Sequence, residues 1–123
     1  MSIAYIPYGA YWSTPFVRWQ GALGELHSLK LAAWVASRAL AKRGIGPEAF
    51  DFGVLGMTVP QQGCFYGLPW AMGELGASHV GGPTIMQACA TSARSVQVAA
   101  QEVAAGLATC ALVLTCDRVS NGP

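Results

Sequence analysis

Residues 81–93 read Gly-Gly-Pro-Thr-Ile-Met-Gln-Ala-Cys-Ala-Thr-Ser-Ala, a short apolar stretch followed by small side chains. The pattern predicts a strand over 84–88 that leads directly into a helix, with Cys89 where the helix begins. A cysteine at that point faces unpaired backbone N–H groups and the positive end of the helix dipole, and both favour the thiolate. The thiolate is the nucleophile in acyl transfer, and the small neighbours leave room for a bulky substrate. The alternative is a buried structural cysteine, which is common among free cysteines.

Apolar runs predict four strands, at residues 3–6, 52–59, 84–88 and 109–116. Helical patterns lie between them, and this alternation is typical of an α/β fold with a mostly parallel sheet and helices on both faces. Leu112, Val113 and Leu114 make the last run continuously apolar, so we expect that strand to be central in the sheet.

Helices are predicted over 28–43, roughly over 67–75, and after Cys89. The first helix ends at Gly44, and its core side carries Leu29, Ala32, Ala33, Ala36 and Leu40. In the last helix an apolar face is expected from Val96, Ala99, Ala100, Val103 and Leu107. Residues 7–24 show no clear period and are predicted to form a long ordered loop.

Several short motifs follow one another along the chain in a recognisable order. They are Ser13-Thr14-Pro15-Phe16, Gly21-Ala22-Leu23, the Asp-Phe-Gly-Val-Leu-Gly run at 51–56, Cys89-Ala90-Thr91-Ser92 and Asp117-Arg118-Val119-Ser120. In order and spacing they resemble the N-terminal half of thiolases, the acetyl-CoA acetyltransferase family. Four residues depart from the usual family pattern and indicate a divergent, thiolase-like branch: Ser13, Met86, Thr91 and Ser92.

The resemblance implies a domain organisation. Thiolases consist of two similar βαβαβαββ halves with a loop domain inserted into the first half. Residues 1–123 would be a partial N-terminal thiolase domain with the βαβαβαβ part of the first half, and the loop domain and C-terminal half would lie outside this chain. The other half would supply a histidine and a second cysteine to the site. We therefore expect this chain alone to be inactive, and to work with the remaining part as the same gene product or a second chain.

The resemblance also implies a chemistry. Cys89 would be the catalytic residue of an acyltransferase that condenses acyl-CoA thioesters or cleaves 3-ketoacyl-CoA through a cysteine acyl-enzyme. Coenzyme A thioesters would be substrates, with no permanently bound cofactor and no metal, and the complete protein would be a homo-oligomer. Two alternatives remain open: a β-ketoacyl synthase-like condensing enzyme, and a non-catalytic thiolase-like protein that binds acyl groups or lipids or acts as a scaffold.

Composition narrows the partners. The chain is 53% hydrophobic and 11% charged, with a formal net charge of +1. Its lysines and arginines form no cluster, so we expect it to bind neither nucleic acid nor a membrane surface. The low charge indicates that much apolar surface meets another protein surface. No apolar segment is long enough to span a bilayer, and we expect a cytoplasmic protein.

For the other cysteines, the histidines and the tryptophans, the sequence favours structural roles. The cysteines at 64, 110 and 116 lack metal-ligand spacing, and Cys110 and Cys116 would point from one strand into the core. His27 and His79 are weighed as bases for the thiol, but a structural role is favoured for both. The four tryptophans are expected to pack in the core or at an interface.

Overall fold

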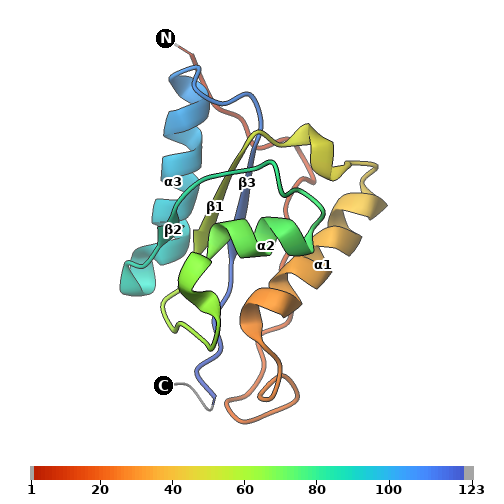
Figure 1. Ribbon diagram of the computed structural model, residues 1–123, viewed down its shortest axis with the longest axis vertical. Coiled ribbons are helices and arrows are strands. Elements are labelled where there is room, and N and C mark those ends of the chain that lie inside the picture. Colours follow the sequence, from red (N-terminus) through yellow and green to blue (C-terminus); the bar gives the residue numbers. More distant parts are fainter. Residues whose placement is uncertain (1, 121–123) are drawn as a thin grey trace.

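The computed structural model describes residues 2–120 and forms a layered α/β domain. In chain order the main elements are α1 (Ser28–Lys42), β1 (Phe52–Gly56), α2 (Leu68–Glu74), β2 (Thr84–Ile85), α3 (Thr91–Ala104) and β3 (Ala111–Thr115). Both neighbours of β1 run parallel to it, in the order β2-β1-β3. Figure 1 shows α3 on one side of this sheet and the other two helices on the opposite side. The predicted fold class is therefore confirmed.

Alternate residues of β1 face the two helical layers. A Cβ placed on Gly53 would meet Leu68 of α2, whereas one placed on Gly56 would meet Ser95 of α3. The main hydrophobic core lies on the first of these faces, where α1 and α2 pack on the sheet. Its fully buried members include Leu29, Leu55, Leu68 and Met72. Burial of these side chains is the main source of stability on this face.

The first helix follows its sequence signals closely. α1 begins at Ser28 and buries Leu29, Ala33, Ala36 and Leu40 on one side, as the helical period predicts. Beyond the helix, Gly44 has a φ of +68°, a conformation that suits glycine at the end of a helix. α2 covers most of the predicted 67–75 segment and tolerates Pro69 because the proline lies in its first turn.

The predicted first strand is absent. Residues 3–6 carry no strand, and the side chains of Ile3 and Ile6 are each 65% exposed. A strand needs a neighbour for its backbone N–H and C=O groups, and within residues 2–120 no segment pairs with this one. The N-terminal loop is instead held to α1, because the guanidinium of Arg43 donates to the carbonyl oxygens of Gly9 and Tyr11.

The prediction that residues 109–116 form a central strand is also wrong for the described residues. β3 lies at one edge of the sheet, and β1 is the central strand. The predicted apolar face of α3 is confirmed at Ala99, but the other residues that the helix buries are Thr91 and Ser95. Val96 and Leu107 remain 42% and 76% exposed. The edge position of β3 and the exposed side chains of Val96 and Leu107 have the same cause. The sequence predicts burial for these apolar residues, but the described residues do not pack over them.

Candidate active site

Cys89 lies where the sequence places it, at the start of the helix that follows the third predicted strand. The residue is exposed and sits in a 3₁₀ turn, Ala88–Ala90, which continues directly into α3. The strand before it, β2, is short and ends at Ile85. The position is consistent with the prediction that Cys89 is a presented thiol, and within the described residues Cys89 is not buried.

The turn before Cys89 has an unusual backbone. Ala88 has a φ of +48°, and in residues 2–120 it shares a positive φ outside glycine only with Gln20. For an alanine this left-handed conformation is unfavourable by about 1–2 kcal/mol, so other interactions must stabilise it. Cys89, the next residue, is exposed.

Thr91 supplies two of those interactions. The backbone N–H of Gln87 donates to the Thr91 hydroxyl oxygen at 2.9 Å, and the hydroxyl in turn donates to the carbonyl oxygen of Ala88 at 2.6 Å. The Thr91 residue is only 6% exposed. One turn further along α3, the Ser95 hydroxyl donates to the carbonyl oxygen of Thr91 at 2.7 Å. A buried hydroxyl thus bridges the two residues that precede Cys89.

The helix carrying this turn packs very closely on the central strand. A Cβ on Gly56 would lie 2.6 Å from the Ser95 hydroxyl oxygen and 2.9 Å from the Thr91 methyl carbon. Real Cβ atoms do not come so close to other atoms, so only glycine allows the observed separation of α3 and β1. Gly56 therefore fixes the depth at which the start of α3 sits on the sheet.

The carboxyl ends of all three strands meet at the edge of the sheet where Cys89 lies. Asp117, just after β3, accepts hydrogen bonds from the backbone N–H groups of Thr58 and Val59, just after β1, at 2.8 and 2.7 Å. Its other oxygen binds the Thr58 hydroxyl. Ligand sites in open parallel sheets usually lie outside this edge. Asp117 therefore ties together two of the loops that border the candidate site.

Neither histidine is placed beside the thiol by a contact in the described part of the chain. His27 Nε2 lies 2.9 Å from the carbonyl oxygen of Gln62 and 3.8 Å from the sulfur of Cys64. His79 Nε2 lies 3.0 Å from the carbonyl oxygen of Phe50. These contacts fit the structural roles favoured by the sequence, so residues 2–120 present an exposed thiol with neither histidine placed beside it.

The remaining cysteines are free thiols that are partly buried, in contrast to Cys89. Cys110 and Cys116 pack against the main core, as their spacing predicts. Burial raises the pKa of the Cys116 thiol to about 12, so this residue is a neutral thiol at physiological pH. Burial, followed by the nearby charge of Asp51, also raises the pKa of Cys110. Both are therefore poor nucleophiles.

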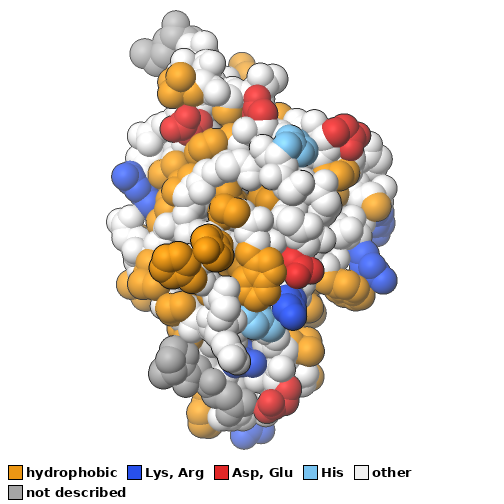
Figure 2. Space-filling view, in the orientation of Figure 1, with side chains coloured by type: hydrophobic (Ala, Val, Ile, Leu, Met, Phe, Trp, Pro, Cys, Tyr) orange, Lys and Arg blue, Asp and Glu red, His pale blue; other side chains and the backbone are white. Residues whose placement is uncertain are grey.

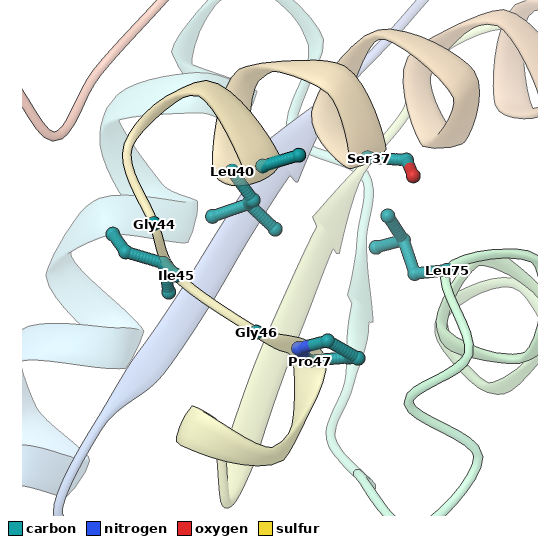
Figure 3. A pocket seen from close by; sticks show the side chains of 8 residues that line it. Ser37, Leu40, Gly44, Ile45, Gly46, Pro47 and Leu75 are labelled. Carbon is teal, nitrogen blue, oxygen red and sulfur yellow. The ribbon is translucent and has the colours of Figure 1, made fainter.

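A groove and a smaller hollow lie on the surface of the described residues. A groove of about 1770 Å³ is lined by Cys89, by the exposed side of α3 and by β3. A smaller hollow of about 300 Å³ lies at the end of α1, where Leu40, Ile45 and Leu75 line it (Figure 3). The smaller hollow has no cysteine in its lining, and its polar side chain is that of Ser37. The groove is the one that includes the candidate nucleophile.

Charge does not single out a polyanion-binding surface. Figure 2 shows acidic and basic side chains scattered between apolar ones on the face in view, without a cluster of one sign. Among residues 2–120, no group of three or more histidine, cysteine or acidic side chains is arranged to hold a metal ion. In the same residues no helix is both long and apolar enough to cross a bilayer.

The layers and the exposed thiol together define a class: an α/β domain with an exposed cysteine at a helix start, beside the carboxyl edge of a parallel sheet. The description "Thiolase, N-terminal domain" matches residues 10–123. The chain therefore belongs to the thiolase family, as the sequence motifs indicate.

Among solved structures, the chain is similar to the priming β-ketosynthase from the R1128 polyketide biosynthetic pathway. The two share 28% sequence identity with a TM-score of 0.60 over 73% of this chain. The match covers 27% of the ketosynthase, so the chain spans about a quarter of that protein's length. A comparison with curated proteins gives no match.

Sequence reasoning found Cys89 but missed the residues that hold it in place. In the sequence Thr91 stands out only as a departure from the family pattern, whereas in the structure its hydroxyl bridges Gln87 and Ala88. Gly56 at the end of a strand and Asp117 after the next strand were not assigned positional roles either. A glycine ending a buried strand and a threonine in the first turn of a helix were the available signals.

Proposed function

We propose that the complete protein is a thiolase-type acyltransferase that acts on acyl-CoA thioesters through an acyl-enzyme on Cys89. The observation that carries the proposal is the exposed thiol on a strained turn at the start of α3, in a chain of the thiolase family. An exposed cysteine beside a helix N-terminus suits nucleophilic catalysis better than it suits packing.

In the first half-reaction Cys89 gives its proton to a base, which we propose is supplied by the second half of the protein. The Cys89 thiolate attacks the carbonyl carbon of the acyl thioester, and a carbon–sulfur bond to the enzyme forms. The bond to the coenzyme A sulfur then breaks, and the departing thiolate takes up the proton that Cys89 lost. Backbone N–H groups at the start of α3 would stabilise the tetrahedral oxyanion between these steps.

The second half-reaction decides the direction. In condensation, the carbanion of a second acyl thioester attacks the acyl-enzyme and yields a 3-ketoacyl-CoA. In thiolytic cleavage, coenzyme A accepts the acyl group instead. Both need an acid and a base, which we propose come from the second half of the protein, because His27 and His79 are engaged elsewhere.

Acyl-enzyme trapping tests this proposal. The complete protein is incubated with acetyl-CoA or a longer acyl-CoA and is then analysed by mass spectrometry under denaturing conditions. We expect one acyl adduct, located on Cys89 and lost in Cys89→Ser. Cys64→Ser is the matched control, because it removes another partly accessible thiol and should keep the adduct. An adduct-free wild-type protein, or an adduct elsewhere, would rule out the proposed role of Cys89.

A β-ketoacyl synthase is the second candidate, supported by the similarity to the priming β-ketosynthase. The two candidates differ in the carrier of the acyl group. Parallel acylation rates with acetyl-CoA and with an acetylated acyl carrier protein separate them. A clear preference for the carrier protein would favour the synthase, and a preference for coenzyme A would favour the thiolase.

We also propose that the complete unit assembles as a homo-oligomer in the cytoplasm. Large apolar side chains are highly exposed in the N-terminal loop, among them Tyr8 and Phe16 at 100% and Tyr5 at 81%. Extended apolar surface of this kind is typical of protein interfaces. Four free thiols agree with a reducing compartment. Analytical ultracentrifugation of the complete protein would give its oligomeric state.

A further inference from the structure

We propose that Thr91 is a positioning residue for the Cys89 nucleophile. Its hydroxyl holds the backbone of Gln87 and Ala88 in the conformation that sets the direction of the thiol. The inference deepens the proposed function and rests on it for its catalytic meaning. The contacts themselves are independent of which acyl group the protein transfers.

The first step of the argument is that the turn cannot be stable through Ala88 alone. A φ of +48° is unfavourable for alanine, and Ala88 is exposed, so the core does not hold it. Two backbone hydrogen bonds close the turn: the N–H of Ala90 donates to the carbonyl oxygen of Gln87 at 3.1 Å, and the N–H of Thr91 donates to the carbonyl oxygen of Ala88. Neither of them binds the N–H of Gln87, so the side of the turn before Ala88 needs a further interaction.

The second step is that the Thr91 hydroxyl binds on both sides of the strained peptide. It accepts from the N–H of Gln87 and donates to the carbonyl oxygen of Ala88, which uses its donor and one acceptor position. Both partners immediately precede Cys89. Rotation of the Ala88 backbone would break the bond to its carbonyl, so the hydroxyl resists the motion that would redirect the thiol.

The third step is that Thr91 is itself held firmly. Its methyl group lies under the start of α3 against Gly56, where even one added carbon would be too close. The Ser95 hydroxyl also binds the Thr91 carbonyl oxygen, but this bond lies on the helix side of Thr91, and its loss would leave both the methyl contact and the hydroxyl contacts of Thr91 in place. The methyl group of Thr91 packs on β1, and its hydroxyl binds the turn. Thr91 therefore links the position of the central strand to that of Ala88, the residue before Cys89.

Three variants of the complete protein test the inference. Thr91→Val keeps the shape but removes the hydroxyl, and Thr91→Ser restores the hydroxyl without the methyl. Ser95→Ala is the control, because it removes a buried hydroxyl one turn away that does not bind Gln87 or Ala88. For each variant we would measure the acylation rate at saturating acetyl-CoA, its half-saturating concentration, the alkylation rate of Cys89 by iodoacetamide, and the melting temperature.

A thiol that points in the wrong direction should slow the acylation step and change the affinity for substrate very little. We expect Thr91→Val to slow acylation about tenfold to a hundredfold with an unchanged half-saturating concentration. Alkylation by the small reagent should stay within about threefold, because the thiol remains exposed. Thr91→Ser should recover most of the acylation rate. Ser95→Ala should lower the melting temperature without slowing acylation. Normal acylation in Thr91→Val, or equal slowing in Ser95→Ala, would overturn the positioning role.

A second readout does not depend on turnover. Crystal structures of the variants give φ of Ala88 directly, which should stay positive in Thr91→Ser and become negative in Thr91→Val. If wild-type protein forms no acyl-enzyme, the proposed function fails, but the φ values still decide whether Thr91 holds the turn. A positive φ retained in Thr91→Val would show that it does not.

Discussion

At the scale of single residues, one alanine carries the strain of the candidate site. Ala88 adopts a left-handed backbone that glycine would adopt freely, and it does so directly before Cys89. Cys89 could be found from sequence because a cysteine among small residues before a helical pattern is a local signal. The left-handed turn could not, because alanine at this position gives no sign of it.

Replacing that alanine gives a prediction about stability. We expect Ala88→Gly to raise the free energy of unfolding by about 1 kcal/mol, because it removes the left-handed strain. Ala93→Gly, in the first turn of α3, should lower the same quantity by about 1 kcal/mol, since glycine is unfavourable inside a helix. Urea unfolding of the complete protein measures both. Equal destabilisation by the two glycines would show that Ala88 is not strained.

At the scale of elements, the sequence predicted helices better than strands. α1 has a helical period, a basic last turn and a glycine after its end, so its signals lie within its own residues. A strand depends on its neighbours, which is why residues 3–6 form none and why β3 lies at an edge. The prediction that Val96 lies on a buried face of α3 was wrong for a similar reason. Val96 is exposed because burial depends on the elements that pack over the helix.

Asp51 joins two of these elements electrostatically. Its carboxylate accepts hydrogen bonds from the backbone N–H groups of Cys110, at 3.0 Å, and Thr109, at 2.9 Å to the nearer oxygen, and so links the starts of β1 and β3. The bonds from Cys110 and then Thr109 lower the pKa of Asp51 below its ordinary value of 3.8. The ionised carboxylate is therefore the form that the fold prefers.

The lowered pKa of Asp51 predicts a pH dependence. Its contribution to stability is fully present above 3.8, the unfolded value, and is lost as pH falls through the lower folded value. We expect Asp51→Asn to lower the melting temperature at neutral pH, and the difference from wild type to shrink in acid. Thr109→Ala keeps both backbone donors and should retain most of the pH dependence. A difference that does not change with pH would exclude this role for Asp51.

At the scale of the whole molecule, apolar surface is left open at the β3 edge. The exposed side of α3, β3 and part of the N-terminal loop line one wide groove. An unpaired strand edge bordered by apolar side chains is a site of aggregation unless something covers it. We propose that the remainder of the complete protein provides that cover.

The open groove predicts the behaviour of the 123-residue segment by itself. We expect it to aggregate, and a monodisperse monomer in size-exclusion chromatography would contradict this. Val96→Lys places a charge in the groove and should increase the fraction that stays in the supernatant after centrifugation. Gln97→Lys adds the same charge on the exposed surface of α3 outside the groove residues and should help less. Equal effects would show that net charge matters and the groove does not.

The close contact at Gly56 limits how this nucleophile could be transplanted. Because α3 packs so closely on β1 that a Cβ on Gly56 would lie 2.6 Å from the Ser95 hydroxyl oxygen, the turn before Cys89 is not a self-contained unit that other sheets could accept. A designer grafting residues 87–91 onto a new scaffold would have to carry along a strand that ends in glycine, at the same register beneath the helix. The smallest segment that could be grafted consists of the strand, the turn and the helix together, although the Cys89 side chain alone would react.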